Sequence, residues 1–139
     1  MQEILKNLYQ YLIMHAQVSA FWLFGSVVQG TNRANSDIDI AVLFKEGLSA
    51  QQRFGLRLEL MAATEELTGR KVDIIDMEAA PLFLQHQIRK TGRLIVEKDH
   101  TYRVNFDVRS RREYFDFAPV LDYRNQRLIQ RVIGENQDG

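Results

Sequence analysis

The stretch that decides the fold is GSVVQGTNRANSDIDI, residues 25–40, where a Gly-Ser pair ends one apolar run and an Asp-Ile-Asp-Ile repeat begins another. The run before it, residues 20–24 (AFWLF), is wholly apolar and stops at a glycine, which is typical of a buried strand. Residues 37–44 (DIDIAVLF) alternate acidic and apolar and then become continuously apolar, which predicts a second strand. Two carboxylates at the start of such a strand call for a chemical explanation.

Asp37 and Asp39 are two residues apart, so a strand projects both from one face, roughly 6–7 Å apart, while Ile38 and Ile40 point into the core. Carboxylates that close repel each other, and burying them unpaired costs several kcal/mol. A divalent cation offsets this cost, and Mg²⁺ commonly takes one or two carboxylates together with substrate phosphates. The alternative is a sheet edge at which Asp37 caps a turn and Asp39 faces water.

The Gly25-Ser26 pair is a candidate anion site at the end of the first strand. Free backbone N–H groups at such a turn bind anions, the serine hydroxyl adds a donor, and glycine lets a phosphate approach closely. The alternative is that Gly25 only turns the chain and Ser26 only caps a helix.

A third carboxylate is available in residues 71–77 (KVDIIDM). Asp73 is favoured because it alternates with Val72 and Ile74, as Asp37 does with Ile38. Asp76 stands at the strand end and is equally suited to capping the next turn. Three carboxylates around two metal ions would clamp the entering and leaving oxygens of a phosphoryl substitution.

The composition is that of an ordinary folded domain, with 139 residues, 45% of them hydrophobic, and eighteen basic against eighteen acidic side chains. This length fits one domain, or one domain with a short helical extension. The charge balance speaks against a nucleic-acid partner held by phosphate contacts, and the lack of cysteine excludes disulfides and thiolate sites. No apolar stretch reaches membrane-spanning length and no signal-peptide pattern is visible, so we expect a cytoplasmic protein without membrane contact.

The apolar pattern predicts an α+β fold, a small mixed β-sheet flanked by helices with a C-terminal helical extension. Helices are expected at residues 2–16, 50–67 and 82–90, and strands at residues 20–24, 37–44, 71–77 and 94–96. The apolar side of the longest helix is expected to consist of Phe54, Leu56, Leu58, Leu60, Met61 and Leu67, with Gly69 as its C-cap. Residues 102–133 mix aromatic and charged side chains around Pro119 and predict two helical pieces at most.

The Gly25-Ser26 pair, ten further residues and Asp37-Ile-Asp39 resemble the GS-x10-DxD signature of the nucleotidyltransferase superfamily with the DNA polymerase β-like palm. The chain is also similar in length to the minimal nucleotidyltransferases. Many of these are antitoxins paired with a HEPN-domain toxin, and some transfer AMP from ATP onto a tyrosine of that toxin. The resemblance covers residues 1–97, the expected nucleotidyltransferase domain, and leaves residues 98–139 as the expected helical extension, packed on that domain or on a partner.

The resemblance implies a role for each residue of the motif. ATP would be bound by Gly25, Ser26, Arg33 and Ser36. Arg33 is the nearest candidate cation, because Val27 and Gln29 stand where many relatives carry arginine. Two Mg²⁺ ions would be held by Asp37, Asp39 and Asp73, and Asp73 would take the proton of the attacking hydroxyl.

The implied partner is a HEPN-type toxin in a hetero-oligomer, with the basic and aromatic tail from Arg109 to Arg131 as a candidate docking surface. The alternative for this tail is a solvated helical face folded onto the domain. Two other functions stay open, namely a catalytically silent antitoxin that acts by binding alone and an adenylyltransferase of a small hydroxylated antibiotic.

Overall fold

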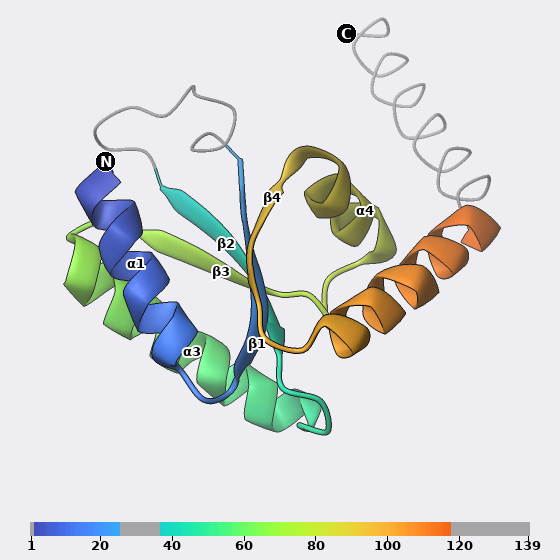
Figure 1. The fold of residues 1–139 in the computed structure, drawn as a ribbon, viewed down its shortest axis with the longest axis horizontal. Coiled ribbons are helices and arrows are strands. Elements are labelled where there is room, and N and C mark those ends of the chain that lie inside the picture. The colour runs from blue at the N-terminus through green and yellow to red at the C-terminus, as the bar shows by residue number, and fades with distance from the viewer. Residues whose placement is uncertain (1, 26–36, 118–139) are drawn as a thin grey trace, which may run out of the picture.

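The structure, a computed structural model, describes residues 2–25 and 37–117. The helices and strands that it assigns in this part of the chain are α1 (Gln2–Met14), β1 (Val18–Phe24), β2 (Ile38–Phe44), α3 (Ala50–Thr68), β3 (Val72–Asp76), α4 (Leu82–Thr91) and β4 (Arg93–Glu97) (Figure 1). A further helix covers residues 100–117. Each expected helix and strand before residue 97 is thus confirmed to within a few residues.

The strands form one sheet in the order β3-β2-β1-β4. β1 runs antiparallel to both of its neighbours, β2 and β4, whereas β2 and β3 are parallel and are joined by α3. A parallel pair needs such a crossover, because its second strand must start at the same end of the sheet as the first. The mixed sheet expected from the sequence is confirmed.

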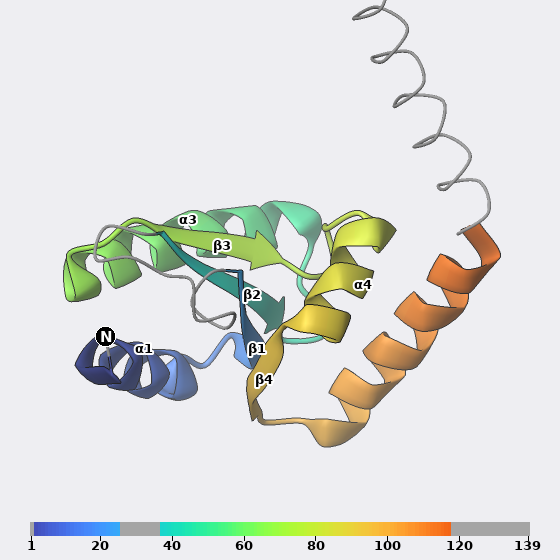
Figure 2. The ribbon, with the colours of Figure 1, turned by 90° about the horizontal axis from the view of Figure 1, so that it is seen from above.

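The helices cover the sheet on both faces. α1 and α3 lie on one face, and α4 and helix 100–117 lie on the other, as Figures 1 and 2 show together. Side chains alternate between these faces along each strand. The α1/α3 face buries Ile38, Ile40, Val72 and Ile74, and the opposite face buries Trp22 and other side chains against α4 and helix 100–117. Trp22 is buried, as expected for the buried strand predicted at residues 20–24.

The apolar side of α3 differs from the sequence-based prediction. Of the six residues expected on that side, Leu60 is fully buried and Leu56 and Met61 are partly buried, but Phe54, Leu58 and Leu67 are 57%, 48% and 43% exposed. The buried row instead follows a four-residue spacing through Leu56, Leu60 and Thr64. Phe54 and Leu58, each two positions away from Leu56, therefore point to solvent. The predicted cap at Gly69 is confirmed, with a φ of 67° and an N–H that donates to Glu65.

Helix 100–117 packs onto the α4 side of the sheet through residues four apart. Phe106 is buried in that core, and Tyr102 contacts the same cluster. Arg103 forms an ion pair with Glu97 of β4, and the hydroxyl of Ser110 donates to Gln85 of α4. The described part of the extension therefore contacts the sheet directly, while the division into domains at residues 97 and 98 stays a prediction. No helix within residues 2–25 and 37–117 is both long and apolar enough to cross a membrane.

Candidate active site

Three of the predicted site residues meet where β1 ends beside the start of β2. Phe24, the last residue of β1, pairs with Asp39 of β2, and Asp39 pairs in turn with Asp73 of β3. Both carboxylates lie on the sheet face opposite to the one that buries Ile38, Ile40, Val72 and Ile74. Gly25 directly follows Phe24, so the turn glycine and two aspartates converge on adjacent strands.

Gly25 leaves room for the carboxylate of Asp39. Its φ is +74°, a left-handed conformation that favours glycine, and a Cβ placed on it would lie only 2.2 Å from Oδ2 of Asp39. A contact that short is not tolerated between nonbonded atoms. The sequence suggested that this glycine lets a phosphate approach the backbone, and the structure adds that it also makes space for one of the acidic side chains.

Asp39 is electrostatically strained in this position. Burial raises the pKa of its carboxyl above the ordinary value, and the negative charges of Asp73 and Asp37 raise this pKa further. The raised pKa means that ionised Asp39 destabilises the folded chain at neutral pH, and that this destabilisation is relieved as the pH falls through the folded pKa. A cation bound beside Asp39 would relieve it without protonation.

The donor set of this site fits Mg²⁺, which takes oxygen ligands and retains waters and substrate phosphates around one or two carboxylates. Asp39 and Asp73 are the register-matched pair, and Asp37 is exposed one residue before β2. Over the described stretches no group of three or more acidic or histidine side chains is already arranged to hold a metal ion. The register-matched pair supplies two carboxylates, the number that Mg²⁺ commonly takes when substrate phosphates and waters provide its other ligands.

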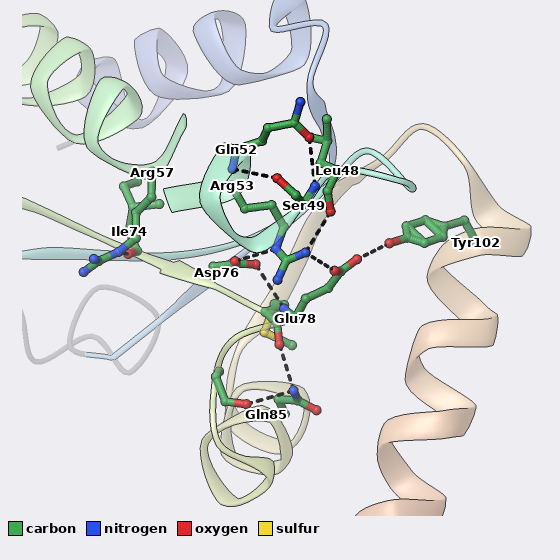
Figure 3. Close-up of polar contacts among 12 residues, drawn as sticks. Leu48, Ser49, Gln52, Arg53, Arg57, Ile74, Asp76, Glu78, Gln85 and Tyr102 are labelled. Atoms are coloured by element: carbon green, nitrogen blue, oxygen red, sulfur yellow. Dashed lines mark hydrogen bonds and ion pairs between the residues drawn. The ribbon is translucent and has the colours of Figure 1, made fainter. Parts of the chain in front are cut away.

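Asp76, the alternative third carboxylate, points to the other face of the sheet. It lies three residues after Asp73, and an odd spacing along a strand reverses the direction of the side chain. Its Oδ2 accepts a 2.8 Å hydrogen bond from Nε of Arg53 on α3, and its Oδ1 accepts one from the backbone N–H of Glu78 (Figure 3). The Asp76 side chain is only 8% exposed, against 43% for Asp73. Asp76 thus joins α3 to the sheet and caps the turn after β3.

Arg57 is a residue of this region that the sequence did not single out. Its Nε donates to the backbone carbonyl of Ile74, and its Nη2 lies 4.0 Å from Oδ1 of Asp73 (the first of these contacts is drawn in Figure 3). No motif or periodicity near residue 57 indicates this contact, because it depends on how α3 crosses β3. Arg57 places a positive charge beside one of the two paired aspartates.

The remaining predicted residues of the site, Ser26, Arg33 and Ser36, lie outside the described residues, as do Val27 and Gln29. Their roles in nucleotide binding stay predictions.

Two curated relatives resemble this chain in sequence. The protein adenylyltransferase MntA of Shewanella oneidensis is 36% identical over 77 residues, which make up 55% of this chain and 52% of MntA. The matched stretch thus spans about half the length of that relative. A putative protein adenylyltransferase of Methanocaldococcus jannaschii is 33% identical over 86 residues, which make up 62% of this chain and 87% of the relative.

A solved structure shares the fold over nearly the whole chain. It is described as a toxin–antitoxin with AMP-PNP, and its matching chain is 26% identical with a TM-score of 0.66, over 95% of this chain and 98% of that one. The family model "Polymerase beta, Nucleotidyltransferase" matches residues 6–101, a range that contains Gly25, Asp39 and Asp73. The expected polymerase β-like palm is confirmed, and the chain belongs to the polymerase β nucleotidyltransferase family.

Proposed function

We propose that this nucleotidyltransferase is a protein adenylyltransferase that transfers AMP from ATP onto a tyrosine hydroxyl of a HEPN-type toxin and so acts as its antitoxin. The observation that carries the proposal is the pairing of Asp39 with Asp73 beside Gly25. The likeness to the adenylyltransferase MntA and to a toxin–antitoxin structure with AMP-PNP supports it. The expected compartment is the cytoplasm, where ATP is supplied, and the expected assembly is a hetero-oligomer.

The residues of the site take the following roles in this proposal. Asp37, Asp39 and Asp73 would hold two Mg²⁺ ions, which supply positive charge at the entering and leaving oxygens of the phosphoryl group. Gly25 and Ser26, with Arg33 and Ser36, would bind the triphosphate of ATP.

The chemical step is a substitution at the α-phosphorus of ATP. The oxygen of the acceptor hydroxyl forms a bond to this phosphorus, the bond to the bridging oxygen of the β-phosphate breaks, and pyrophosphate leaves. The hydroxyl proton would pass to the carboxylate of Asp73, whose side chain is 43% exposed on this face. Catalysis rests mainly on positioning and on charge stabilisation, because the protein forms no covalent intermediate in this step.

The proposal is tested by Asp39→Asn with α-labelled ATP and the purified HEPN-type toxin of the same source. Label transfer to the toxin should fall by at least about 100-fold, since the amide cannot replace a carboxylate that organises the reacting charges. The Tm of the variant should stay equal or rise, because the substitution removes a carboxylate whose pKa is raised by burial and by repulsion from Asp73 and Asp37. This result separates lost chemistry from lost folding.

Asp116→Asn is the matched control, because it makes the same change at an exposed position of helix 100–117. Wild-type label transfer by Asp39→Asn would refute the proposed role of the site. A variant that transfers no label but still neutralises the toxin at equal expression would instead favour an antitoxin that acts by binding alone.

A further inference from the structure

A groove between α4 and helix 100–117 lies outside the proposed catalytic residues. It encloses about 240 Å³. Its lining residues come from the last turns of α4 and from the end of the described helix, and they are His86, Arg89, Lys90, Arg111, Tyr114 and Phe115. We call this set the basic groove.

The basic groove concentrates positive charge in a chain whose total charge is zero. Three of its lining residues are Arg89, Lys90 and Arg111, and none is acidic. Burial lowers the pKa of Arg89, and the neighbouring charge of Arg111 lowers it further, although Asp107 acts in the opposite direction. No carboxylate in the described part of the chain forms an ion pair with Lys90 or Arg111. These two cations are therefore available to an external anionic group.

Aromatic and apolar side chains surround these cations. The rings of His86 and Tyr114 stack at 4.0 Å between centroids and 4° between planes, which ties the two helices together at the groove. Phe115 is 70% exposed, although it is a large apolar side chain.

Exposed apolar side chains also lie next to cations along the outer sides of both helices. On helix 100–117, the exposed Val108 precedes Arg111 by three residues and Phe115 by seven, a spacing that puts all three on one side. On α4, the exposed Phe83 precedes Lys90 by seven residues and so shares its side. Each helix thus presents an apolar side chain together with a cation.

This chemistry favours a protein over a nucleic acid or a small anion. The volume lies below the roughly 300–1,000 Å³ of typical small-molecule pockets. A chain with no net charge lacks the basic excess of nucleic-acid-binding proteins. Arginine and aromatic residues are, in contrast, the side chains enriched at the centres of protein interfaces.

The groove also lies on the same side of the sheet as the paired aspartates. α4 and helix 100–117 cover the sheet face opposite α1 and α3, and Asp39 and Asp73 project from that same face. One bound protein can therefore contact both the groove and the site. Contacts distant from the reacting atoms help to orient a hydroxyl for attack.

We propose that the basic groove is the docking surface for the protein that receives AMP, through a segment of that protein that places carboxylates around an apolar side chain. The identity of this partner rests on the proposed function above. Docking at the groove should determine the affinity for the acceptor protein and leave the affinity for ATP unchanged, because none of its lining residues belongs to the catalytic or nucleotide-binding set.

The test uses the full-length chain and the purified HEPN-type toxin of the same source. Arg111→Glu should weaken toxin binding by at least 10-fold and raise the KM for the toxin, with ATP binding and Tm unchanged. Phe115→Ala should weaken toxin binding with little dependence on salt, since it removes only apolar contact. The matched controls are Arg112→Glu and Phe117→Ala, two exposed residues of the same helix that do not line the groove.

The outcomes separate this inference from the proposed function. If the wild type binds and labels the toxin and the groove variants match their controls, the docking assignment is refuted and the proposed function stands. If the wild type neither binds nor labels the toxin, both fail. Loss of binding to a labelled RNA oligonucleotide in Arg111→Glu, with unchanged toxin binding, would overturn the protein assignment in favour of a nucleic acid.

Discussion

Gly25→Ala is the sharpest perturbation that the site offers, because two separate costs meet at one residue. The first is conformational, since Gly25 has a φ of +74° and a side chain in the left-handed region costs about 1–2 kcal/mol. The second is steric, since the new Cβ would stand 2.2 Å from Oδ2 and 3.1 Å from Cγ of Asp39. Asp39 must move, or the chain at Gly25 must move.

The expected loss of stability follows from adding these costs. Forcing an extra carbon into a packed site costs about 1–3 kcal/mol, so the free energy of unfolding should fall by about 2–5 kcal/mol in total. For a chain of this size, each kcal/mol corresponds to a fall in Tm of about 3–5 °C. The displaced carboxylate should also reduce AMP transfer by about 100-fold, as small misplacements of catalytic groups do.

Gly69→Ala is the matched control. Gly69 has a φ of +67°, and nothing lies within 4 Å of a Cβ built on it, so the control carries the conformational cost alone. Its free energy of unfolding should fall by about 1–2 kcal/mol, and label transfer at a temperature where it is folded should match the wild type. Urea denaturation and transfer of α-labelled ATP measure both quantities. If Gly25→Ala and Gly69→Ala prove equal in stability and activity, the close contact between Gly25 and Asp39 does not determine the position of the Asp39 carboxylate.

Two further predictions concern β3 and the helix that packs beside it. Asp73→Asn should abolish AMP transfer and change the free energy of unfolding by less than about 1 kcal/mol, because the side chain is half exposed. Asp76→Asn should lower the free energy of unfolding by about 3 kcal/mol, because it breaks a buried ion pair, and should leave transfer by the folded protein intact. Denaturation and labelling of both variants measure these effects, and the reverse pattern would make Asp76 the catalytic carboxylate. Tyr102→Phe removes the hydrogen bond that the hydroxyl donates to Glu78. The free energy of unfolding should therefore fall by about 1.5 kcal/mol, and the amides of residues 100–110 should exchange faster. An unchanged Tm and an unchanged exchange rate would show that this bond does not anchor the helix.

The pKa of Tyr102 is consistent with a hydroxyl that donates a hydrogen bond to Glu78. Burial raises the pKa of the phenol well above its ordinary value, and the hydrogen bond to Glu78 and the charge of that residue raise it further. The hydroxyl therefore stays protonated and remains a donor throughout the neutral range. Glu78 in turn lies 2.8 Å from Nη1 of Arg53, which also holds Asp76 (Figure 3). Helix 100–117 is thus connected through polar side chains to the end of β3.

The sequence by itself determined the local features of this protein. The apolar alternation at residues 37–44, the unbroken run before Gly25 and the glycine after α3 are each decided by neighbouring residues, because strand and helix periodicity and glycine conformations act over a few positions. The Gly25-Ser26 pair and the two aspartates Asp37 and Asp39 carried the resemblance to the nucleotidyltransferase family, which the family match over residues 6–101 confirms. Within the described residues, these predictions agree with the structure.

The tertiary structure alone decided which distant groups meet. Parallel pairing of β2 with β3 aligned Asp39 with Asp73. The packing of α3 on the other face brought Arg53 into hydrogen-bonding distance of Asp76. The same packing left Phe54 of α3 in solvent, although its hydrophobicity indicated the core. These outcomes depend on the register between strands and on the rotation of a helix against the sheet. Both are set by contacts among residues far apart in the chain, so no local pattern contains them.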